Sequence, residues 1–266
     1  MKISVITEEI FERAVGYSEA DSLFACNINL SLRANAPILK IDGDSVVCDF
    51  IFAILDENSE IKGLIKSVVG GYEVFAREAS NELIDALGDF FLFHERKSFF
   101  SSREIIEGLR GLVGGEISKS IVMRSFGRGE NALRDETSYP KLKCAYELLE
   151  RAFPSSCKKD QLEEWAYNMR RKLLAGGRAE LIFDQEERCC ACCFVDGDNE
   201  ECSLISSVAV SPLKRHMGLG SRVVGNALDC IKRGKTVYAV LQKPELTEFY
   251  EKIGFSYFGI KYELKI

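Results

Sequence analysis

The sequence contains no apolar run long enough to cross a membrane. A membrane-spanning helix needs roughly 18 or more consecutive apolar residues, and no such run occurs among the 266 residues. The first residues, MKISVITEEIFERAV, contain acids where a secretory signal peptide has its apolar core. We therefore predict a cytoplasmic protein with no membrane partner.

Excess positive charge is absent, and histidine is scarce. The net charge is −6, with 35 basic and 41 acidic side chains. Nucleic-acid binding relies on a concentrated basic face that neutralises phosphates, so we predict no nucleic-acid partner. Only His94 and His216 could act as imidazole ligands, whereas a zinc site usually needs two ligand pairs separated by a loop.

Cysteine is abundant, with ten residues, and many of them lie between residues 189 and 202. In an extended strand Cys189 and Cys193 face one side, whereas Cys190 and Cys192 face the other, so the four thiols do not converge on one ion. A buried free cysteine packs as a small hydrophobic residue. We therefore predict core-filling cysteines in a reducing compartment and no metal site.

The length favours two domains, because a domain typically has about 150 residues. The segment SFGRGENALRDETSYP, residues 125–140, is polar, contains glycine and ends in proline, which is typical of a linker. We place the boundary there. The prediction is an N-terminal α/β domain over residues 1–130 and a C-terminal domain over residues 131–266.

The N-terminal domain has a weak hydrophobic pattern. We expect a helix over residues 1–30, strands joined by hairpins over 37–76, and a helix over 78–93. Residues 97–125 are harder to assign. Within them, GLVGG at 111–115 does not follow an apolar strand, which favours a loop.

The C-terminal domain has a clearer pattern. Two helices are expected over residues 141–153 and 158–177, followed by three antiparallel strands over 178–210. Helix, strand, helix and strand then alternate over 221–266, where the last part is either a strand pair or one bent strand. This order predicts an α+β fold with a mixed, mostly antiparallel sheet flanked by helices.

Two closely spaced glycines follow the strand SLISSVAV in the segment RHMGLGS, residues 215–221. The next helix begins near residue 220, so the glycines lie at its N-terminus. A helix N-terminus offers unpaired N–H groups and a partial positive charge, and glycine lets a phosphate approach them. Lys214, Arg215 and Arg222 add positive charge. The segment predicts a diphosphate-binding loop; the alternative is a strand–turn–helix joint in which glycine only relieves strain.

The order of this loop and its neighbours resembles the GNAT family of acyl-CoA N-acyltransferases. A strand ending in V-A-V-S-P, the R-x-x-G-x-G-S loop, a helix, a strand and F-Y-E-K-x-G-F follow one another within residues 138–266. The resemblance implies that the loop holds the pyrophosphate of acetyl-CoA (coenzyme A) and that the preceding strand pairs with its pantetheine arm. The residues implied for cofactor binding are Val208, Ala209, Val210, Arg215, His216, Met217, Gly218, Leu219, Gly220 and Ser221.

The same resemblance implies an acetyl-CoA-dependent N-acetyltransferase that acts on a primary amine of a small molecule or a peptide. It assigns Tyr250 as the general acid for the departing sulfur. Family members often carry a glutamate on the strand before the loop, but here that strand has no acid, which leaves Ser206, or a water that it holds, and Glu201 as catalytic candidates. Lys243 stands where members often have asparagine. These departures keep open a non-catalytic acyl-CoA sensor or interaction module.

The N-terminal domain has the coarse order of elements of the same family, but it has no R-x-x-G-x-G loop. Two interpretations stay open for it. It is either a degenerate GNAT-like domain that lost its cofactor loop, or a different α/β module that shapes the substrate pocket. The sequence does not indicate the oligomeric state.

Overall fold

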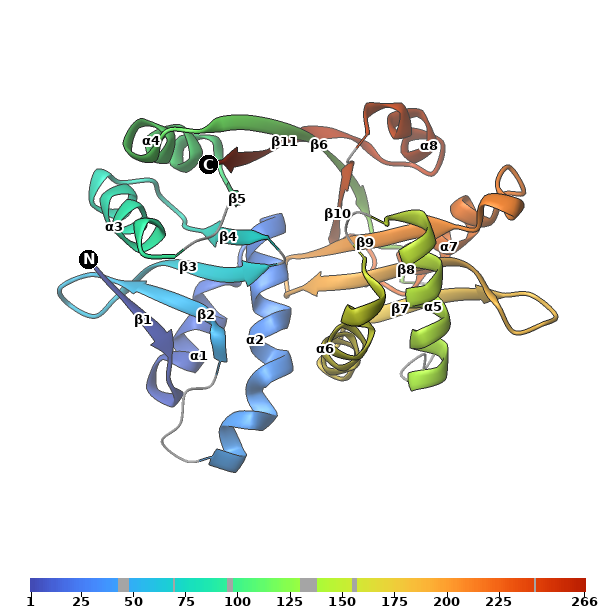
Figure 1. The fold of residues 1–266 in the computed structure, drawn as a ribbon, viewed down its shortest axis with the longest axis horizontal. Helices are drawn as coiled ribbons and strands as arrows, with labels where there is room; N and C mark the ends of the chain where they lie inside the picture. Colours follow the sequence, from blue (N-terminus) through green and yellow to red (C-terminus); the bar gives the residue numbers. More distant parts are fainter. Residues whose placement is uncertain (43–47, 69, 95–97, 130–137, 155–156, 242) are drawn as a thin grey trace.

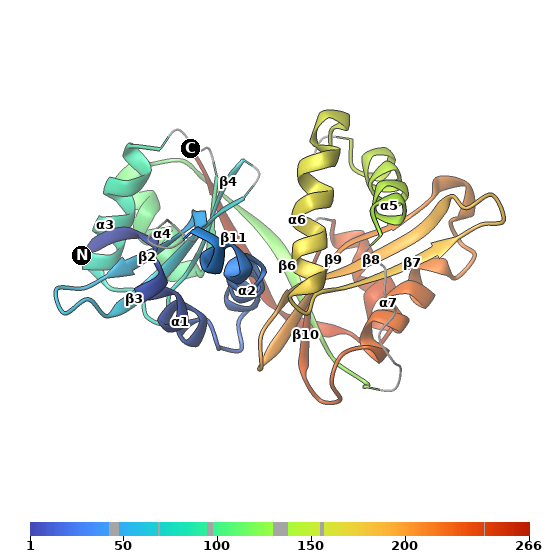
Figure 2. The same cartoon turned by 90° about the horizontal axis from the view of Figure 1, so that it is seen from below.

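The computed structural model describes residues 1–266 apart from 43–47, 69, 95–97, 130–137, 155–156 and 242. The strands form one continuous eleven-stranded sheet, to which the two halves of the chain both contribute. We call residues 1–126 the N-terminal half and residues 138–266 the C-terminal half. Figures 1 and 2 show the two halves side by side, joined through the middle of the sheet.

The N-terminal half alternates strands with helices. Its elements are β1 (Lys2–Ile6), α1 (Glu8–Tyr17), α2 (Leu23–Asp42), β2 (Cys48–Leu55), β3 (Ile61–Val68), β4 (Gly71–Phe75), α3 (Asn81–Leu92), β5 (Ser98–Ser101), α4 (Arg103–Val113) and β6 (Glu116–Phe126).

The C-terminal half begins with two helices, after which strands and helices follow one another. Its elements are α5 (Tyr139–Ala152), η1 (Lys159–Gln161), α6 (Leu162–Leu174), β7 (Arg178–Phe183), β8 (Cys189–Asp198), β9 (Cys202–Val210), η2 (Pro212–Lys214), α7 (Leu219–Asp229), β10 (Thr236–Leu241), η3 (Pro244–Leu246), α8 (Thr247–Lys252) and β11 (Ser256–Lys265), where η denotes a 3-10 helix.

The two halves exchange strands at the centre of the sheet. The strand order is β1-β2-β3-β4-β5-β11-β6-β10-β9-β8-β7. The last strand of the chain, β11, therefore lies between two N-terminal strands, with Tyr262 opposite Ser101 of β5 and Ile260 opposite Ile121 of β6. On its other edge β6 pairs with β10, where Ile121 lies opposite Leu241. Each half thus completes the sheet of the other.

Helices cover both faces of the C-terminal strands. Val223 and Val224 of α7 and Tyr250 of α8 pack with Ala191 and Cys193 on one face. On the opposite face, helices α5 and α6 enclose a second core; its members include Leu142, Leu149, Met169, Cys189, Cys192 and Phe194. Because neighbouring residues of a strand point to opposite faces, β8 contributes to both cores and is buried over most of its length.

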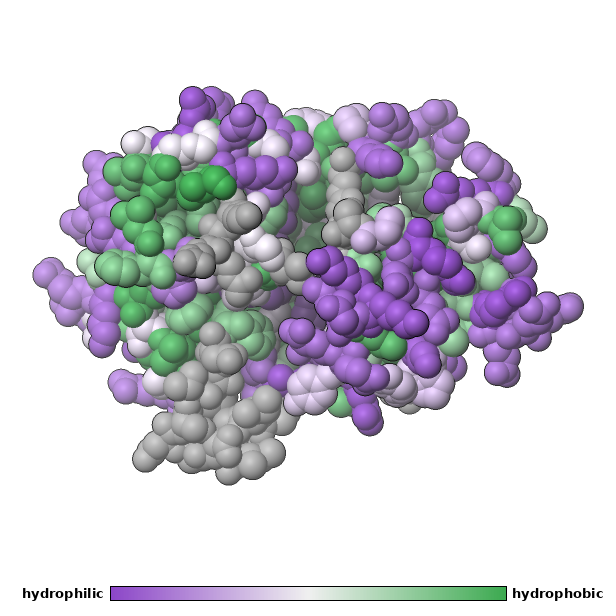
Figure 3. Space-filling model, in the orientation of Figure 1, coloured by the Kyte–Doolittle hydropathy of each residue, from purple (hydrophilic) through white to green (hydrophobic). Residues whose placement is uncertain are grey.

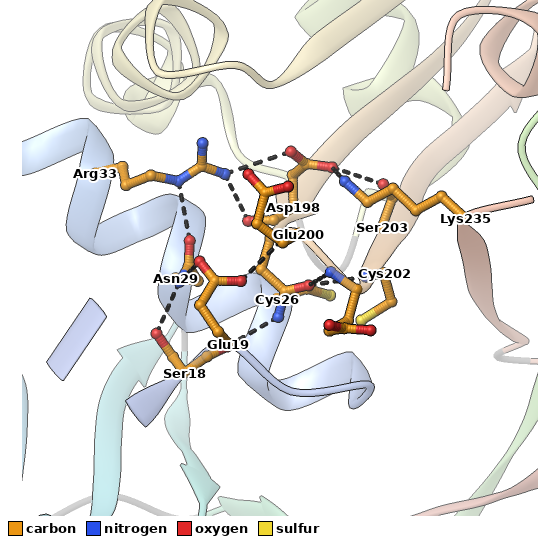
Figure 4. A network of polar contacts seen from close by, with 12 residues as sticks. Ser18, Glu19, Cys26, Asn29, Arg33, Asp198, Glu200, Cys202, Ser203 and Lys235 are labelled. Carbon is orange, nitrogen blue, oxygen red and sulfur yellow. Dashed lines mark hydrogen bonds and ion pairs between the residues drawn. The ribbon is translucent and has the colours of Figure 1, made fainter. Parts of the chain in front are cut away.

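The turn between β8 and β9 fastens the C-terminal half to helices α1 and α2. The Asn199 side-chain amide donates hydrogen bonds to the carbonyl oxygens of Ser18 (2.8 Å) and Ala20 (2.9 Å). Arg33 of α2 and Lys235 meet the Asp198 carboxylate at 3.3 and 2.6 Å (Figure 4). This dense polar contact holds the α1–α2 corner against the start of β9.

The surface differs between the halves on the face seen in Figure 3. Hydrophobic side chains gather over the N-terminal half near α3 and α4, where Leu92, Phe93 and Leu112 are 75, 86 and 54% exposed. Hydrophilic side chains cover α5 and α6. No helix within the described ranges is long and apolar enough to cross a membrane.

The predicted helix over residues 1–30 is wrong. This region contains β1, α1 and the beginning of α2, and residues 37–41, expected as a strand, belong to α2. The reason is that α2 is enclosed on several sides: Cys26, Ile28, Leu30 and Leu32 are all fully buried, so no single apolar stripe marks it in the sequence. The expected turn after it falls largely within residues 43–47, outside the described residues.

The region 97–125 is also more regular than predicted, because it contains β5, α4 and most of β6. The glycine pair Gly114 and Gly115, with φ of +77° and +100°, makes the turn between α4 and β6. The helix predicted over 78–93 is confirmed as α3. The predicted domain boundary at 130/131 lies within residues 130–137, outside the described part of the chain.

The predicted α+β class is confirmed, with a mixed sheet in which only β9–β10 and β4–β5 pair in parallel among the described strands.

The expected alternation of the cysteines along β8 is wrong in detail. A β-bulge at Cys190 places Cys189 and Cys192 together toward α5 and α6, whereas Cys193 faces α7. Among the described residues, no three histidine, cysteine, aspartate or glutamate side chains are arranged to hold a metal ion.

Candidate functional site

The parallel strands β9 and β10 separate after a short paired stretch. Residues 202–205 pair with residues 236–239, and beyond Ile205 no described residue of β10 continues the ladder, although β9 runs on to Val210. Figure 1 shows the two strands diverging there, toward α8 and the start of α7. The edge of β9 that faces β10 therefore presents backbone groups without a partner strand over 206–210.

A β-bulge marks the point where the strands separate. Ser206 lies opposite Phe194 and Ala209 lies opposite Cys192, so β9 has one residue more than β8 in this interval. Ser207 has φ of +49°, in the left-handed region that residues with a side chain rarely adopt. Since a bulge bends its strand and leaves one residue unpaired, it changes the direction of the amide groups next to Val208.

The segment 215–218 leads from β9 into α7 and leaves the helix N-terminus uncovered. Gly218 is the N-cap of α7 with φ of +74°, and no side chain in the described part of the chain caps the helix. The first helical hydrogen bond runs from the Arg222 amide to the Gly218 carbonyl (3.0 Å). The amides of Leu219, Gly220 and Ser221 precede it and have no acceptor within the helix. This is the geometry that favours an anion.

The side chains around this N-terminus are mostly exposed and basic. Arg215 and Arg222 are exposed, and His216, with φ of +63°, is exposed as well. Lys214 is half-buried, with its ammonium 3.8 Å from the Asp184 carboxylate. Positive charge therefore surrounds the uncapped helix end, although part of the Lys214 charge is compensated.

Gly220 packs closely against the base of α8. A Cβ atom at this position would lie 3.1 Å from the Phe249 ring and 3.5 Å from Val210. A side chain at residue 220 would therefore press on the residue next to Tyr250. Phe249 was not among the predicted site residues; the only sequence signal for it is the adjacent aromatic pair Phe249-Tyr250.

Tyr250 lies in an apolar environment on the α7 and α8 face of the sheet. Its side chain is 6% exposed and its ring meets those of Phe249 and Phe255 edge-on at 5.1 and 5.3 Å. Burial raises the pKa of Tyr250 well above its ordinary value. The hydroxyl therefore stays protonated at neutral pH, as a proton donor must.

The two other predicted catalytic residues lie far apart along β9. Ser206 is half-buried at the bulge, and its Oγ lies 3.4 Å from Oγ of Ser207. Glu201 is exposed in the β8–β9 turn, at the opposite end of β9 from the α7 loop. The strand separation thus brings Ser206 close to the predicted cofactor segment, and it does not bring Glu201 there.

The corresponding place in the N-terminal half is closed. Strands β4 and β5 also pair in parallel, but the buried Ser101 hydroxyl donates a hydrogen bond to the Val74 carbonyl (2.9 Å) across the end of that pairing. The next helix, α3, is capped by Ser80, whose oxygen accepts from the Leu83 amide (3.2 Å). Among the described residues, the hydrogen bond of Ser101 therefore closes the gap between these two strands, and the helix that follows β4 has a capped N-terminus, unlike α7.

The comparisons with known proteins agree with this geometry. Residues 142–255 match the acetyltransferase (GNAT) family, and no curated protein matches the sequence. A Drosophila protein of known structure superposes with a TM-score of 0.66 at 9% identity, covering 99% of this chain and 98% of its own. A GNAT-family acetyltransferase from Colwellia psychrerythraea superposes at 0.57 and 10% identity, covering 100% of both chains.

A tandem GNAT protein from the clavulanic acid biosynthesis pathway also superposes with a TM-score of 0.57, at 10% identity, over 99% of this chain and 98% of its own. At such identities the likeness concerns the fold, and it extends over both halves. The family match covers the separated strands, the loop and α8. The C-terminal half of this chain therefore belongs to the GNAT family of acetyltransferases, which are acyltransferases, and the whole chain shares the fold of GNAT proteins.

Proposed function

We propose that this protein transfers an acetyl group from acetyl-CoA to a primary amine of a small molecule or a peptide. The observation that carries the proposal is the meeting of three features at one end of the C-terminal half. These are the open edge of β9, the uncapped N-terminus of α7 and the buried side chain of Tyr250.

The residues fit acetyl-CoA in shape and charge. The amides of Leu219, Gly220 and Ser221 would hold the pyrophosphate, with Arg215 beside them. The space next to Gly218 is open, since a Cβ there would meet no atom within 4 Å. The open edge of β9 over 208–210 would pair with the pantetheine amides.

Acetyl-CoA supplies a thioester, so that a C–N bond to the acceptor forms while the C–S bond breaks. The backbone amide near Val208 would polarise the carbonyl oxygen of the acetyl group. The Tyr250 hydroxyl would give its proton to the departing sulfur and regain one from solvent afterwards. A water held by the Ser206 hydroxyl would take the proton that the acceptor amine loses.

Replacing Gly218 tests the loop. Valine at this position would place a branched side chain in the open space and in a left-handed backbone conformation that disfavours it. We expect Gly218→Val to lose most of its affinity for acetyl-CoA in calorimetry. Gly234→Val is the matched control, because Gly234 also has positive φ (+80°) and open surroundings but lies beyond the other end of α7. Equal acetyl-CoA affinity of Gly218→Val and wild type would overturn the loop assignment.

A non-catalytic acyl-CoA sensor is the second candidate, favoured by the absence of an acidic side chain from β9. Release of free thiol from acetyl-CoA in the presence of a panel of amines separates the two functions. An enzyme releases thiol in proportion to amine, whereas a sensor binds acetyl-CoA and leaves the thioester intact.

A further inference from the structure

Six polar side chains meet where α2 lies between the two halves, and we call them the junction cluster. They come from six different elements, α2, β3, β4, α6, β8 and β11. The members are Asn27, Lys66, Glu73, Lys172, Asp196 and Lys261.

One carboxylate of the junction cluster is fully partnered. Glu73 accepts hydrogen bonds from the Asn27 side-chain amide and from the Lys261 ammonium, the latter at 2.9 Å. Lys261 also lies over the rings of Phe24 and Phe100, at 5.4 and 4.5 Å from their centroids. The charges of Glu73 and Lys261 therefore compensate each other.

The other two lysines are compensated unequally. Lys172 donates to the main-chain oxygen of Asp196 (2.9 Å) and lies 3.8 Å from its carboxylate. Lys66 is 6% exposed, and its one hydrogen bond to a described residue goes to the neutral side-chain oxygen of Asn27 (2.8 Å). A buried ammonium has three N–H groups to satisfy, so two N–H groups of Lys66 need another acceptor.

A buried acceptor is left over in the same cluster. Oδ1 of Asp196 is buried and has no hydrogen-bond partner among the described residues. Buried polar atoms are almost always partnered in folded proteins, by protein, by water or by a ligand. Among the described residues, the Lys66 ammonium therefore has too few hydrogen-bond acceptors, and Oδ1 of Asp196 has no hydrogen-bond donor.

This pair lies near the separated strands. Asp196 is two residues along β8 from Phe194, which lies opposite Ser206 at the bulge of β9. Two residues of a regular strand span roughly 7 Å, and the β-bulge at Asp196 makes this stretch no longer than that. The Asp196 carboxylate lies 3.8 Å from the Lys172 ammonium of α6, which places this side chain on the α6 side of the sheet. Phe194 packs on the same side, in the core of α5 and α6. The route from Ser206 to the junction cluster therefore follows one face of the sheet.

We propose that the junction cluster binds the acceptor substrate, and that this substrate is an amine which also carries an anionic group. The amine end donates a hydrogen bond to Asp196 Oδ1 near Ser206, and the anionic end accepts from the Lys66 ammonium. This inference rests on the proposed transferase function, because it names the acceptor of that reaction.

The charge balance supports an anionic end. The junction cluster holds three lysines and two carboxylates, and Lys66 is the lysine that forms no ion pair with a carboxylate among the described residues, whereas Lys172 pairs with Asp196 and Lys261 pairs with Glu73. Burial and the repulsion from Lys172 lower the pKa of Lys66 to about 7. A bound carboxylate or phosphate would raise that pKa, so binding at pH 8 takes up protons from solution.

Calorimetry on the full chain without acetyl-CoA tests the proposal. The probes are ω-amino acids of three to six carbons, beginning with β-alanine, together with the alkylamine and the alkyl carboxylate of each length; phosphoethanolamine supplies the phosphate arm. We expect at least one ω-amino acid or phosphoethanolamine to bind about ten-fold or more tightly than its matched amine, the effect of one charge-assisted hydrogen bond. Binding in buffers of different ionisation heat should show proton uptake at pH 8.

Two substitutions assign the two ends. Lys66→Met should abolish the preference for the anionic probe and the proton uptake, and Asp196→Asn should weaken the amine end. Lys62→Met is the control, because Lys62 lies on the same strand but its side chain is 40% exposed and pairs with Asp56 and Glu60. A melting curve establishes that each variant is folded, and the proton uptake of the wild type tests the proposal even where a variant does not fold.

Equal affinity for the matched amines and for the probes that carry an anionic group, or an unchanged preference in folded Lys66→Met, overturns the proposal. These outcomes are distinct from failure of the proposed function. Acetyl transfer to plain alkylamines at the same rate would leave the transferase function intact and remove the anionic acceptor. Binding of the ω-amino acids without any thiol release would support the anionic ligand and contradict the transferase function.

Discussion

Tyr250 is the residue on which the proposed chemistry depends most directly. Tyr250→Phe removes one oxygen and keeps the ring contacts with Phe249 and Phe255. We expect kcat for acetyl transfer to fall by about 10²–10⁴-fold, the usual contribution of a general acid. Affinity for acetyl-CoA should stay near that of wild type, because the hydroxyl acts mainly once charge develops on sulfur.

Rapid-quench measurement of the chemical step checks this expectation. Tyr146→Phe is the control, since the Tyr146 hydroxyl donates to the Lys158 carbonyl (2.6 Å) in the α5–α6 region, away from the separated strands. An unchanged chemical rate in Tyr250→Phe would make Tyr250 a packing residue only.

Lys66 makes the stability of the fold depend on pH. Its pKa falls from 10.5 to about 7 on burial, so between pH 7 and 10.5 the unfolded chain binds a proton that the folded chain does not. The contribution of Lys66 to the free energy of unfolding therefore rises with pH in this window, by up to about 1.4 kcal/mol per pH unit. Below pH 7 this contribution does not change with pH. Urea unfolding at pH 7, 8 and 9 should show this slope, and Lys66→Met should remove it while Lys62→Met keeps it. A slope that survives in Lys66→Met would contradict the burial argument.

The β8–β9 turn contributes stability through a single side chain. Asn199 is buried, donates to two carbonyls of the α1–α2 corner and accepts from the amides of Glu201 and Cys202 at 3.0 and 2.8 Å. Asn199→Ala leaves the amides of Glu201 and Cys202 without this acceptor and removes one of the donors to each carbonyl, and we expect a loss of roughly 2–4 kcal/mol in the free energy of unfolding. Chemical denaturation measures it, and Asn58→Ala in the exposed β2–β3 turn is the reference. A loss no larger than that of Asn58→Ala would show that the turn is not a fastening point.

The elements of the C-terminal half could be predicted because their signals are local. Helix α7 packs one face on the sheet, where Val223, Val224 and Ala227 are buried, and this spacing of apolar residues predicts a helix. Gly234 follows the helix and indicates where it ends. The phosphate loop is likewise one short segment. Helix α2 lacked such signals because it is buried on several sides, and β5 was missed because it has only four residues.

The rest of the site depends on contacts between distant segments, which a single sequence does not reveal. The bulge at Ser207 exists only relative to β8, and the junction cluster joins Asn27 to Asp196 and Lys261 across most of the chain. The strand exchange between the two halves could not be predicted for the same reason. Its partners Ser101 and Tyr262 are paired in space and far apart in sequence.

The exchange makes the two halves one folding unit. A fragment of residues 134–266 lacks β5 and β6, so β10 keeps only β9 as a neighbour and β11 loses both of its neighbours. We expect this fragment to be unfolded or insoluble, because a central strand would become an exposed edge. A fragment of residues 116–266 restores β6 and should be more soluble and regain acetyl-CoA affinity. Full affinity in the shorter fragment, measured by calorimetry beside circular dichroism, would contradict this view.

The position of β11 also bears on how the protein is made. Ribosomes release a chain from its N-terminus, and β5, formed from residues 98–101, receives one of its two neighbours only from residues 262–265. The N-terminal half therefore emerges with a gap in its sheet that stays open until β11 has been synthesised. During that interval the edges of β5 and β6 are exposed to solvent, and the sheet is completed only after β11 has left the ribosome.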